Sequence, residues 1–256
     1  MTAPFASAPI DDQWNGGPDP SGADELDHLV YLSNLIGREP RLVQPGGGNT
    51  SIKIGDALLV KGSGTDLRTI DRSGFTRLSL QALGALGTAR SMRDDEMMRF
   101  MAGCMLEPGP TPSVETPLHS LLAHRVIAHT HDVATMSLTN VDDRTAERLV
   151  GDVSGGEIVY VPYVRPGFPL ARAVAEMADR LPPSAIGLAL AHHGLMVWAE
   201  DARECYARLL RVVNAIEGFL ATKRRARAVP GLVSDAILPA GAHRRALEVV
   251  MPAVRG

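Results

Sequence analysis

The sequence predicts an α/β protein, because segments with strand character alternate along it with segments of helical periodicity. A hairpin signal over residues 51–60 precedes an amphipathic helical pattern over 94–105. A buried-strand signal over 185–191 likewise precedes a long helical stripe over 201–227. No linker-like stretch interrupts the chain of 256 residues, so we expect a single domain over residues 23–256.

The N-terminal region divides into an arm and a first helix. Residues 1–22 are rich in Pro, Gly, Asp and Ala and have no periodicity, which predicts an arm that is disordered or loosely draped over the fold. Regular structure should begin near Asp24 with a helix. This helix should end at Gly37, since glycine commonly follows the last turn of a helix. The apolar residues at helical spacing between them are Leu26, Leu29, Val30 and Ile36.

Glycine-rich turns flank the predicted hairpin. Ser51–Ile54 alternates polar and apolar residues, Gly55-Asp56 supplies the turn, and an apolar run follows. The turns over 45–51 and 61–66 leave backbone amides free to approach an anion. Neither turn matches a dinucleotide or triphosphate loop, and ordinary hairpin chemistry would explain both. They indicate a phosphate or carboxylate site only in combination with other features.

Two longer helices are predicted in the later part of the chain. Asp94–Met105 is Met-rich and amphipathic, a pattern more typical of a core helix than of a cofactor site. The helix over 201–227 is long enough to pack against the sheet or another subunit. Its basic cluster over 223–227 suits the negative end of the helix dipole, which favours a solvated helix end over a polyanion site.

Two histidines one residue apart, His129 and His131, lie in a segment of strand character. Alternation along a strand places both imidazoles on one face, together with Ile127 and Val133. Convergent imidazoles in an apolar wall are typical of metal ligands. Two hydrogen-bonded core histidines on a half-buried strand would give the same pattern.

A second pair, His192 and His193, follows the apolar run over 185–191. Zinc binds imidazole readily and a catalytic zinc has about three protein ligands, so one of these histidines could complete a set of three. The cysteines, Cys104 and Cys205, lie far apart in apolar helical stretches, which favours core positions in a reducing compartment over a thiolate site.

The segment Pro112–Leu122 carries a carboxylate at a predicted helix start. Ser113 can cap this helix, Glu115 falls in its first turn, and His119 lies on the same face one turn later. Stabilisation by the helix dipole would explain Glu115 without any catalytic role. His119 could support the site or could be a buried polar neighbour.

Composition limits the possible partners. A hydrophobic content of 45%, a net charge of −3 and a pI near 6.2 give no broad basic field for nucleic acid. No apolar stretch approaches the roughly 20 residues that cross a bilayer, and the N-terminus lacks a signal-peptide pattern. We expect a cytoplasmic protein with no nucleic-acid or membrane partner.

Five motifs occur in order along residues 24–225: Gly47-Gly-Asn-Thr-Ser51, Lys61-Gly-Ser-Gly-Thr65, Pro112-Ser-Val-Glu-Thr-Pro-Leu-His119, His129-Thr-His131 and His193-Gly194. Together they resemble the class II aldolase/adducin family. The flanking segments 162–168 and 193–201 look most like the aldolase domain of bifunctional rhamnulose-phosphate aldolase/alcohol dehydrogenases. Because the sequence contains no dinucleotide fingerprint, we expect the redox half to be absent from this chain.

The resemblance implies a three-layer α/β/α fold around a mixed, mainly antiparallel sheet, and a homotetramer with the active site at the subunit interface. It implies that zinc, or another divalent transition metal, is bound by His129, His131 and His193, with Glu115 as the catalytic carboxylate. The positions that match the family's phosphate cradle are Asn49, Ser63, Gly64 and Ser113. A second serine is usual before the glutamate, where this chain has Val114. The family's tyrosine acid comes from a neighbouring subunit, and the candidates are Tyr160, Tyr163 and Tyr206.

The implied function is a zinc-dependent aldolase that cleaves a ketose or ketose 1-phosphate, similar to rhamnulose 1-phosphate, through an enediolate stabilised by the metal. Alternatives are a sugar-phosphate epimerase, dehydratase or decarboxylase of the same superfamily, or a non-catalytic adducin-like protein. The epimerases carry an aspartate at the position of Glu115, so glutamate favours an aldolase over an epimerase. It does not separate an aldolase from a dehydratase or decarboxylase.

Overall fold

The computed structural model describes residues 8–18, 22–178 and 180–223, and within these ranges a seven-stranded sheet forms the centre of the fold. Its strand order is β3-β2-β1-β4-β7-β6-β5, and every neighbouring pair is antiparallel except β5 and β6. The strands are β1 (Asn49–Ile54), β2 (Ala57–Lys61), β3 (Phe75–Ser79), β4 (Val126–Thr130), β5 (Ile158–Val161), β6 (Gly187–Leu190) and β7 (Gly194–Ala199). The predicted mixed, mainly antiparallel sheet is confirmed.

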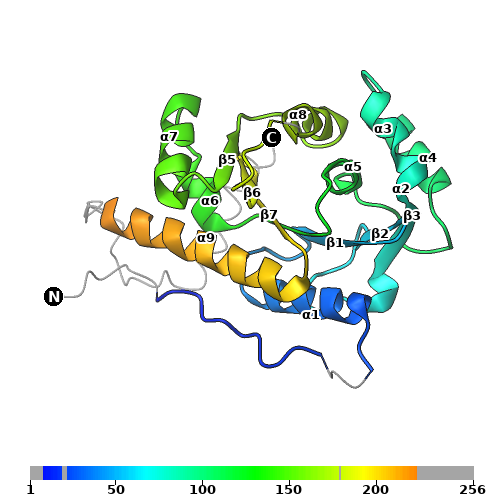
Figure 1. Ribbon diagram of the computed structural model, residues 1–256, viewed down its shortest axis with the longest axis horizontal. Coiled ribbons are helices and arrows are strands. Elements are labelled where there is room, and N and C mark those ends of the chain that lie inside the picture. The colour runs from blue at the N-terminus through cyan, green and yellow to red at the C-terminus, as the bar shows by residue number, and fades with distance from the viewer. Residues whose placement is uncertain (1–7, 19–21, 179, 224–256) are drawn as a thin grey trace, which may run out of the picture. The chain divides into compact units, whose positions relative to one another are not determined.

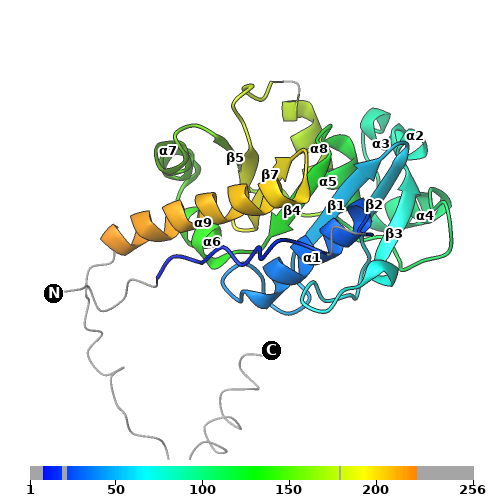
Figure 2. The ribbon, with the colours of Figure 1, turned by 60° about the horizontal axis from the view of Figure 1, so that its bottom comes forward.

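Helices cover both faces of this sheet and give the expected three layers (Figure 1, Figure 2). α1 (Glu25–Arg38) and α9 (Ala202–Lys223) lie on one face, which is the lower face in Figure 1. α5 (Thr116–Leu121) and α8 (Phe168–Ala178) lie on the other. The other helical segments of the described ranges are α2 (Leu80–Leu83), α3 (Ala85–Thr88), α4 (Asp94–Gly103), α6 (Val133–Leu138), α7 (Asp143–Ser154) and the 3-10 turn η1 (Arg72–Gly74).

The sheet separates two apolar layers, because successive side chains of a strand point to opposite faces. On β4, Ala128 belongs to the larger core cluster, which also contains Leu209 of α9. Its neighbour Ile127 belongs to a second cluster with Leu118 of α5. His129 shares the face of Ile127, so β4 directs this histidine to the α5 side of the sheet.

The first helix begins as predicted but ends differently. Asp24 accepts a hydrogen bond from the backbone of Asp27, whose side chain accepts one from the backbone of Asp24 in return. Gly37 lies inside α1, which continues to Arg38. A Cβ at Gly37 would be 2.1 Å from the backbone nitrogen of Arg68. The prediction of a helix stop at Gly37 is therefore wrong, because the glycine allows a loop to approach the helix.

Several other predicted elements are confirmed. Gly55-Asp56 joins β1 to β2, and α4 buries Met97 and Met101 as the amphipathic pattern indicated. α9 packs its apolar stripe into the core cluster beneath the sheet. The predicted continuation of this helix to Arg227, with most of its basic cluster, lies outside the described residues. The single domain over 23–256 stays a prediction for the same reason.

The N-terminal arm lies against α1 and α9 over residues 8–18. Ile10 is 5% exposed, and its backbone exchanges two hydrogen bonds, of 2.8 and 3.0 Å, with the side-chain amide of Asn214 on α9. Trp14 packs against the same core cluster. Two apolar side chains thus anchor a segment whose average composition is polar and irregular. The arm over 1–22 as a whole stays a prediction, because residues 1–7 and 19–21 lie outside the described residues.

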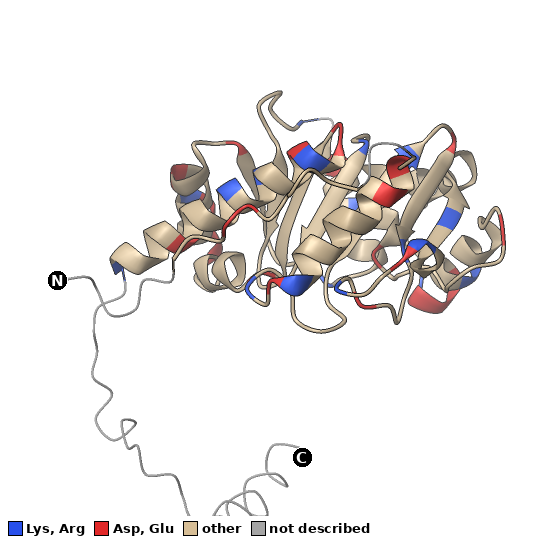
Figure 3. Ribbon diagram, turned by 90° about the horizontal axis from the view of Figure 1, so that it is seen from below, with Lys and Arg blue, Asp and Glu red and all other residues tan. Residues whose placement is uncertain are grey.

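The face covered by α1 and α9 carries charged residues of both signs, mixed along the helices rather than gathered in one basic field (Figure 3). Among the described residues, no helix is both long enough and apolar enough to span a bilayer.

Candidate metal centre

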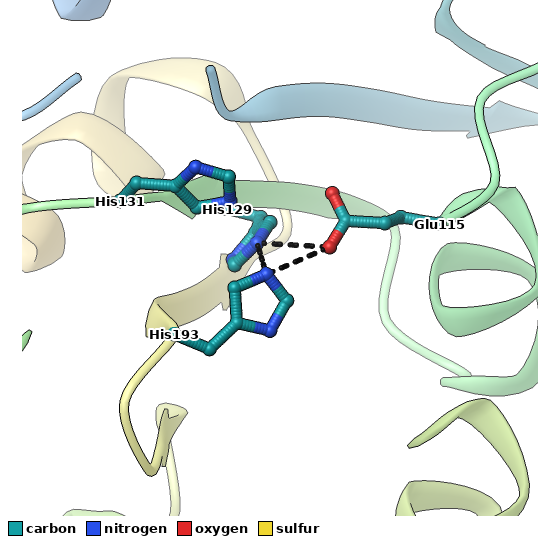
Figure 4. Close-up of side chains that lie close together, drawn as sticks. All are labelled: Glu115, His129, His131 and His193. Carbon is teal, nitrogen blue, oxygen red and sulfur yellow. Dashed lines mark hydrogen bonds and ion pairs between the residues drawn. The ribbon is translucent and has the colours of Figure 1, made fainter. Parts of the chain in front are cut away.

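Four side chains from separate parts of the chain converge on the α5 side of the sheet: Glu115, His129, His131 and His193 (Figure 4). Glu115 directly precedes α5, His129 lies on β4, His131 follows β4, and His193 lies in the turn between β6 and β7. One possible ligand atom from each residue lies within 4.8 Å of those of the other three. The structure thus brings together the three histidines and the carboxylate that the sequence singled out.

The end of β4 determines where the first two histidines point. His129 pairs with Asn49 of β1 across the antiparallel ladder. The strand stops at Thr130 because Asp132 accepts a hydrogen bond from the backbone of α6 and caps that helix. Val133 therefore begins α6 and is 49% exposed. The prediction that Val133 shares the apolar wall of the histidines is wrong, since the strand alternation ends before it.

Glycine allows the backbone to approach the imidazoles closely. A Cβ at Gly47 would lie 3.1 Å from Nδ1 of His131. A Cβ at Gly194 would lie 2.0 Å from the backbone oxygen of Thr130, so any larger residue would separate β7 from the end of β4. His192, with a φ of 55°, forms the tight turn that precedes His193. The glycine turn over 45–48 is thus part of the wall around the histidines.

The nitrogen positions fit a tetrahedral metal. Nδ1 of His129 bonds the backbone carbonyl of Leu195 at 3.1 Å, which directs the lone pair of Nε2 in neutral His129 into the cluster. The Nε2 atoms of His129 and His193 are 3.3 Å apart. Two nitrogens bound at about 2.0–2.1 Å to one tetrahedral zinc would be about 3.3–3.4 Å apart. Nε2 of His131 is buried without a hydrogen-bond partner among the described residues. A bound cation would satisfy all three nitrogens.

Glu115 faces these nitrogens as an ionised carboxylate. Its Oε1 lies 2.9 Å from Nε2 of His193 and 3.4 Å from Nε2 of His129. Burial alone would raise the pKa of Glu115, but His129 and His193 outweigh burial and hold this pKa well below its usual range. Burial, together with the neighbouring His129, lowers the pKa of His131 to about 4, so this imidazole is neutral and able to bind a metal at pH 7.

Helix α5 starts later than predicted. Its first residue is Thr116, and Glu115 occupies the capping position rather than the first turn. Ser113 forms the turn before the helix: its Oγ accepts from the backbone of Glu115 at 3.2 Å, and its carbonyl accepts from the backbone of Thr116. Because Glu115 lies before the helix, its side chain faces the histidines. Inside the helix, its direction would be set by the helix face.

Asn49 lies directly against the carboxylate. Its Nδ2 donates to Oε2 of Glu115 at 2.6 Å, and its Oδ1 contacts Nε2 of His119. Nδ1 of His119 in turn lies 2.7 Å from Oγ of Ser51. All four residues are buried. His119, which the sequence left open as a supporting residue or a simple neighbour, is thus connected to Glu115 through Asn49.

The other residues predicted to hold phosphate come together on two adjacent loops. Gly62 forms a β-bridge with Pro112, which brings Ser63 and Gly64 beside the loop that carries Ser113. Gly64 has a φ of 81°, a conformation that favours glycine, and both Ser63 and Gly64 are exposed. These loops adjoin Glu115, because Ser113 lies two residues before it. The backbone amide of Ser63 donates to the carbonyl of Thr111 at 2.8 Å, so the hydroxyl of Ser63 is the group that this residue offers to an anion.

Lys61 is a residue of this region that the sequence reasoning did not single out. It ends β2 and is only 5% exposed. Burial lowers the pKa of its ammonium, although the carboxylates of Glu115 and Asp66 act in the opposite direction. The available signal was a lysine at the end of an otherwise apolar strand, directly before a glycine turn.

The three candidate tyrosines differ in their surroundings. The hydroxyl of Tyr160 donates to Asp143 at 2.6 Å, and Tyr206 is 1% exposed within the core. Tyr163 is 58% exposed, and its ring centroid lies 6.0 Å from that of His192. Tyr163 is therefore the candidate with a hydroxyl available to substrate or to another subunit.

Comparison with known proteins identifies the family. A profile of the Class II Aldolase and Adducin N-terminal domain matches residues 27–220, and the chain belongs to this family. The N-terminal class II aldolase domain of a conserved protein from Thermoplasma acidophilum superimposes with a TM-score of 0.70 and 33% identity, covering 86% of this chain and 99% of that one.

The chain is also similar to two curated relatives, over different shares of their length. It is 34% identical over 247 residues to the uncharacterized oxidoreductase YuxG of Bacillus subtilis (strain 168), covering 93% of this chain but 35% of that protein. It therefore spans about a third of the length of YuxG. It is 30% identical over 154 residues to a methylthioribulose-1-phosphate dehydratase of Pseudomonas syringae pv. syringae (strain B728a), covering 53% of this chain and 72% of that enzyme.

Proposed function

We propose that this protein is a zinc-dependent lyase that cleaves the carbon–carbon bond of a ketose or ketose 1-phosphate. The observation that carries the proposal is the position of the Glu115 carboxylate, with Oε1 at 2.9 and 3.4 Å from two imidazole nitrogens that face each other. A metal site with an adjacent carboxylate combines a Lewis acid with a proton acceptor, which is what aldol chemistry requires.

In this mechanism His129, His131 and His193 hold the metal. A divalent metal bound there supplies a Lewis acid for the negative charge that develops on substrate oxygen during cleavage. The ionised Glu115 accepts the proton from the reacting carbon in the direction of synthesis and returns it after cleavage. Asn49 keeps Oε2 of that carboxylate occupied, so that Oε1 is the atom presented to the substrate.

Ser63, Gly64 and Ser113 form the proposed cradle for a substrate phosphate. Their two loops touch at the bridge between Gly62 and Pro112, and an anion bound there would lie at the edge of the carboxylate site. In this proposal the exposed Tyr163 donates a proton to the aldehyde oxygen in the direction of synthesis and takes it back from the substrate hydroxyl in cleavage, within a site shared between subunits of a homotetramer. The hydroxyls of the other two candidates are hydrogen-bonded or buried.

A dehydratase is the second candidate. The similarity to a methylthioribulose-1-phosphate dehydratase over 72% of that enzyme favours it specifically. A dehydratase uses the same metal and carboxylate but expels water instead of breaking a carbon–carbon bond. The epimerase, decarboxylase and adducin-like alternatives lack a comparable observation in this chain.

The test is a screen of ketoses and ketose 1-phosphates with zinc-reconstituted protein, followed by identification of the products. We expect a three-carbon ketone and an aldehyde. Glu115→Gln should retain zinc and lose about 10²–10⁴-fold in rate, whereas His193→Ala should lose the metal itself. Loss of water without cleavage would support the dehydratase. Wild-type protein that binds no metal after reconstitution would contradict both functions.

A further inference from the structure

Four buried polar side chains on the α5 side of the sheet form a carboxylate network: Ser51, His119, Asn49 and Glu115. Ser51 and His119 are fully buried, Asn49 is 3% exposed and Glu115 is 8% exposed. Asn49 and Ser51 both lie on β1. Glu115 is the residue that caps α5, and His119 lies within that helix four residues later. The network therefore connects the strand beside β4 to the helix that presents the carboxylate.

The direction of each hydrogen bond follows from the chemistry of the groups. An ionised Glu115 can only accept, so the atom of Asn49 that faces it at 2.6 Å is the amide nitrogen. The amide oxygen then faces His119 and needs a donor, which only Nε2–H can supply. In the neutral imidazole Nδ1 is then an acceptor, and the hydroxyl of Ser51 donates to it at 2.7 Å.

The surroundings of His119 support this proton arrangement. Burial, reinforced by the nearby His129 and Lys53, lowers the pKa of His119 to about 3, and the attraction of Glu115 does not reverse the shift. Lys53 donates to the backbone carbonyl of His119 at 2.9 Å and to that of His124 at 2.6 Å, which fixes the end of α5. His119 is therefore a rigid, uncharged ring that can donate from one nitrogen only.

We propose that His119 is a positioning residue that acts through Asn49: its Nε2–H fixes the orientation of the Asn49 amide, which in turn holds Oε2 of Glu115 and turns Oε1 towards the histidine cluster. Without this donor the amide can rotate and present its oxygen to the carboxylate, which would repel it. Asn49 is thereby assigned to the carboxylate in addition to any role near phosphate. This inference rests on the proposed lyase function for its kinetic consequence, but not for the hydrogen bonds.

The competing explanation is that His119 is only a packed polar residue whose loss weakens the fold. Ser33 provides a matched control, because it is fully buried and bonds Thr50 of β1 at 2.6 Å on the opposite face of the same strand. Ser33→Ala removes a buried hydrogen bond to β1 without touching the carboxylate network. Any effect that His119 variants share with Ser33→Ala is structural.

The first experiment is independent of activity. In the zinc-loaded full chain at pH 7, nitrogen NMR of the imidazoles, assigned with His119→Gln, should show the proton of His119 on Nε2 and a hydrogen-bonded, unprotonated Nδ1. The side-chain amide of Asn49 should give one strongly shifted proton, from its bond to Glu115. A proton of neutral His119 on Nδ1, or a charged ring, would overturn the proposal.

Variants then test whether His119 orients Asn49. The shifted Asn49 signal should disappear in His119→Leu, persist in His119→Gln, whose amide can donate in place of Nε2–H, and persist in Ser33→Ala. Zinc content should stay stoichiometric in all three, because none of these residues belongs to the histidine cluster. An unchanged Asn49 signal in His119→Leu would overturn the proposal. If His119→Leu does not fold, the proton position of His119 in the wild type and the Asn49 signal in His119→Gln still test the proposal.

The kinetic experiment follows with any substrate that wild-type protein converts. His119→Leu should lower kcat about 10–100-fold with KM within about twofold, since misplacing a catalytic group chiefly affects the chemical step. His119→Gln should recover most of this loss. Equal kcat in His119→Leu and Ser33→Ala would overturn the positioning role. A wild type without lyase activity would instead refute the proposed function, while the NMR results would still judge the hydrogen bonds.

Discussion

The two faces of the sheet differ in the side chains that β4 and its neighbours bury. On the face of α1 and α9, β4 and β7 contribute apolar side chains such as Ala128 and Val197 to the larger core cluster, together with Leu209. On the face of α5, the same strand β4 contributes His129, and its neighbour β1 contributes Asn49, both among the buried residues.

One sheet can thus carry the side chains that stabilise the fold on one face and the candidate site on the other. Apolar burial on the α9 face stabilises the fold in proportion to the area removed from water. Buried polar groups on the α5 face cost desolvation and are retained only where hydrogen bonds or a cation compensate them. Substitutions on the two faces should therefore change different measured quantities.

The largest effect should come from the α5 face. His129→Ala should abolish stoichiometric zinc binding and reduce any lyase rate by about a thousandfold, because the Lewis acid contributes several kcal/mol to the transition state. Zinc analysis and product formation provide the measurements. His28→Ala is the matched control, since His28 lies on α1 outside the cluster. Full zinc content in His129→Ala would contradict the assignment.

On the α9 face, Leu209→Ala should lower the free energy of unfolding by about 2–5 kcal/mol, because Leu209 is fully buried and the cavity cannot close completely. Denaturant unfolding measures the change. Zinc stoichiometry and kcat of the folded variant should remain those of the wild type. A variant that keeps its stability but loses zinc would contradict the assignment of stability to the α9 face and of metal binding to the α5 face.

Lys53 tests the cost of a partly buried charge on the α5 face. Burial lowers its pKa to about 8 from an ordinary value of 10.5. Between these two values the unfolded chain binds more protons than the folded chain, so the free energy of unfolding should rise with pH across the window, by roughly 3 kcal/mol. Lys53→Met should lack this rise. The measurement is the free energy of unfolding of the wild type and of Lys53→Met as a function of pH. If the two curves are parallel, the pKa of Lys53 is not lowered by the fold.

The smallest effect concerns the arm. Asn214→Ala removes the two hydrogen bonds to the backbone of Ile10 and should cost about 1–2 kcal/mol or less. It should also speed proteolytic cleavage within residues 8–18, since the arm loses its polar anchor. Resistance equal to that of the wild type would show that Ile10 and Trp14 suffice to hold the arm.

Much of the fold was predictable because it depends on local periodicity. The β1–β2 hairpin, α4 and α9 follow directly from their patterns of apolar residues. The errors lie where a distant contact decides the outcome. Gly37 lies inside α1 and allows the backbone of Arg68 to approach the helix, so it does not end the helix. Val133 begins α6 because Asp132 caps that helix.

The candidate site was predictable in its members but not in its contacts. Histidine spacing and motif order singled out His129, His131, His193 and Glu115, which the structure brings together. The contact between Asn49 and His119 depends on strand register and on the late start of α5, and a single sequence carries no signal for either. Lys61 opens the motif over 61–65 but was given no role of its own, because one lysine at a strand end is usually solvated.

The proposed function requires that the three histidines bind one divalent metal beside Glu115. X-ray absorption spectroscopy of the zinc-loaded full chain tests it most directly. We expect three imidazole nitrogens and about one further oxygen at about 2.0–2.1 Å, with the imidazole signal reduced in His193→Ala. A spectrum with sulfur ligands, or with oxygen ligands only, would contradict it.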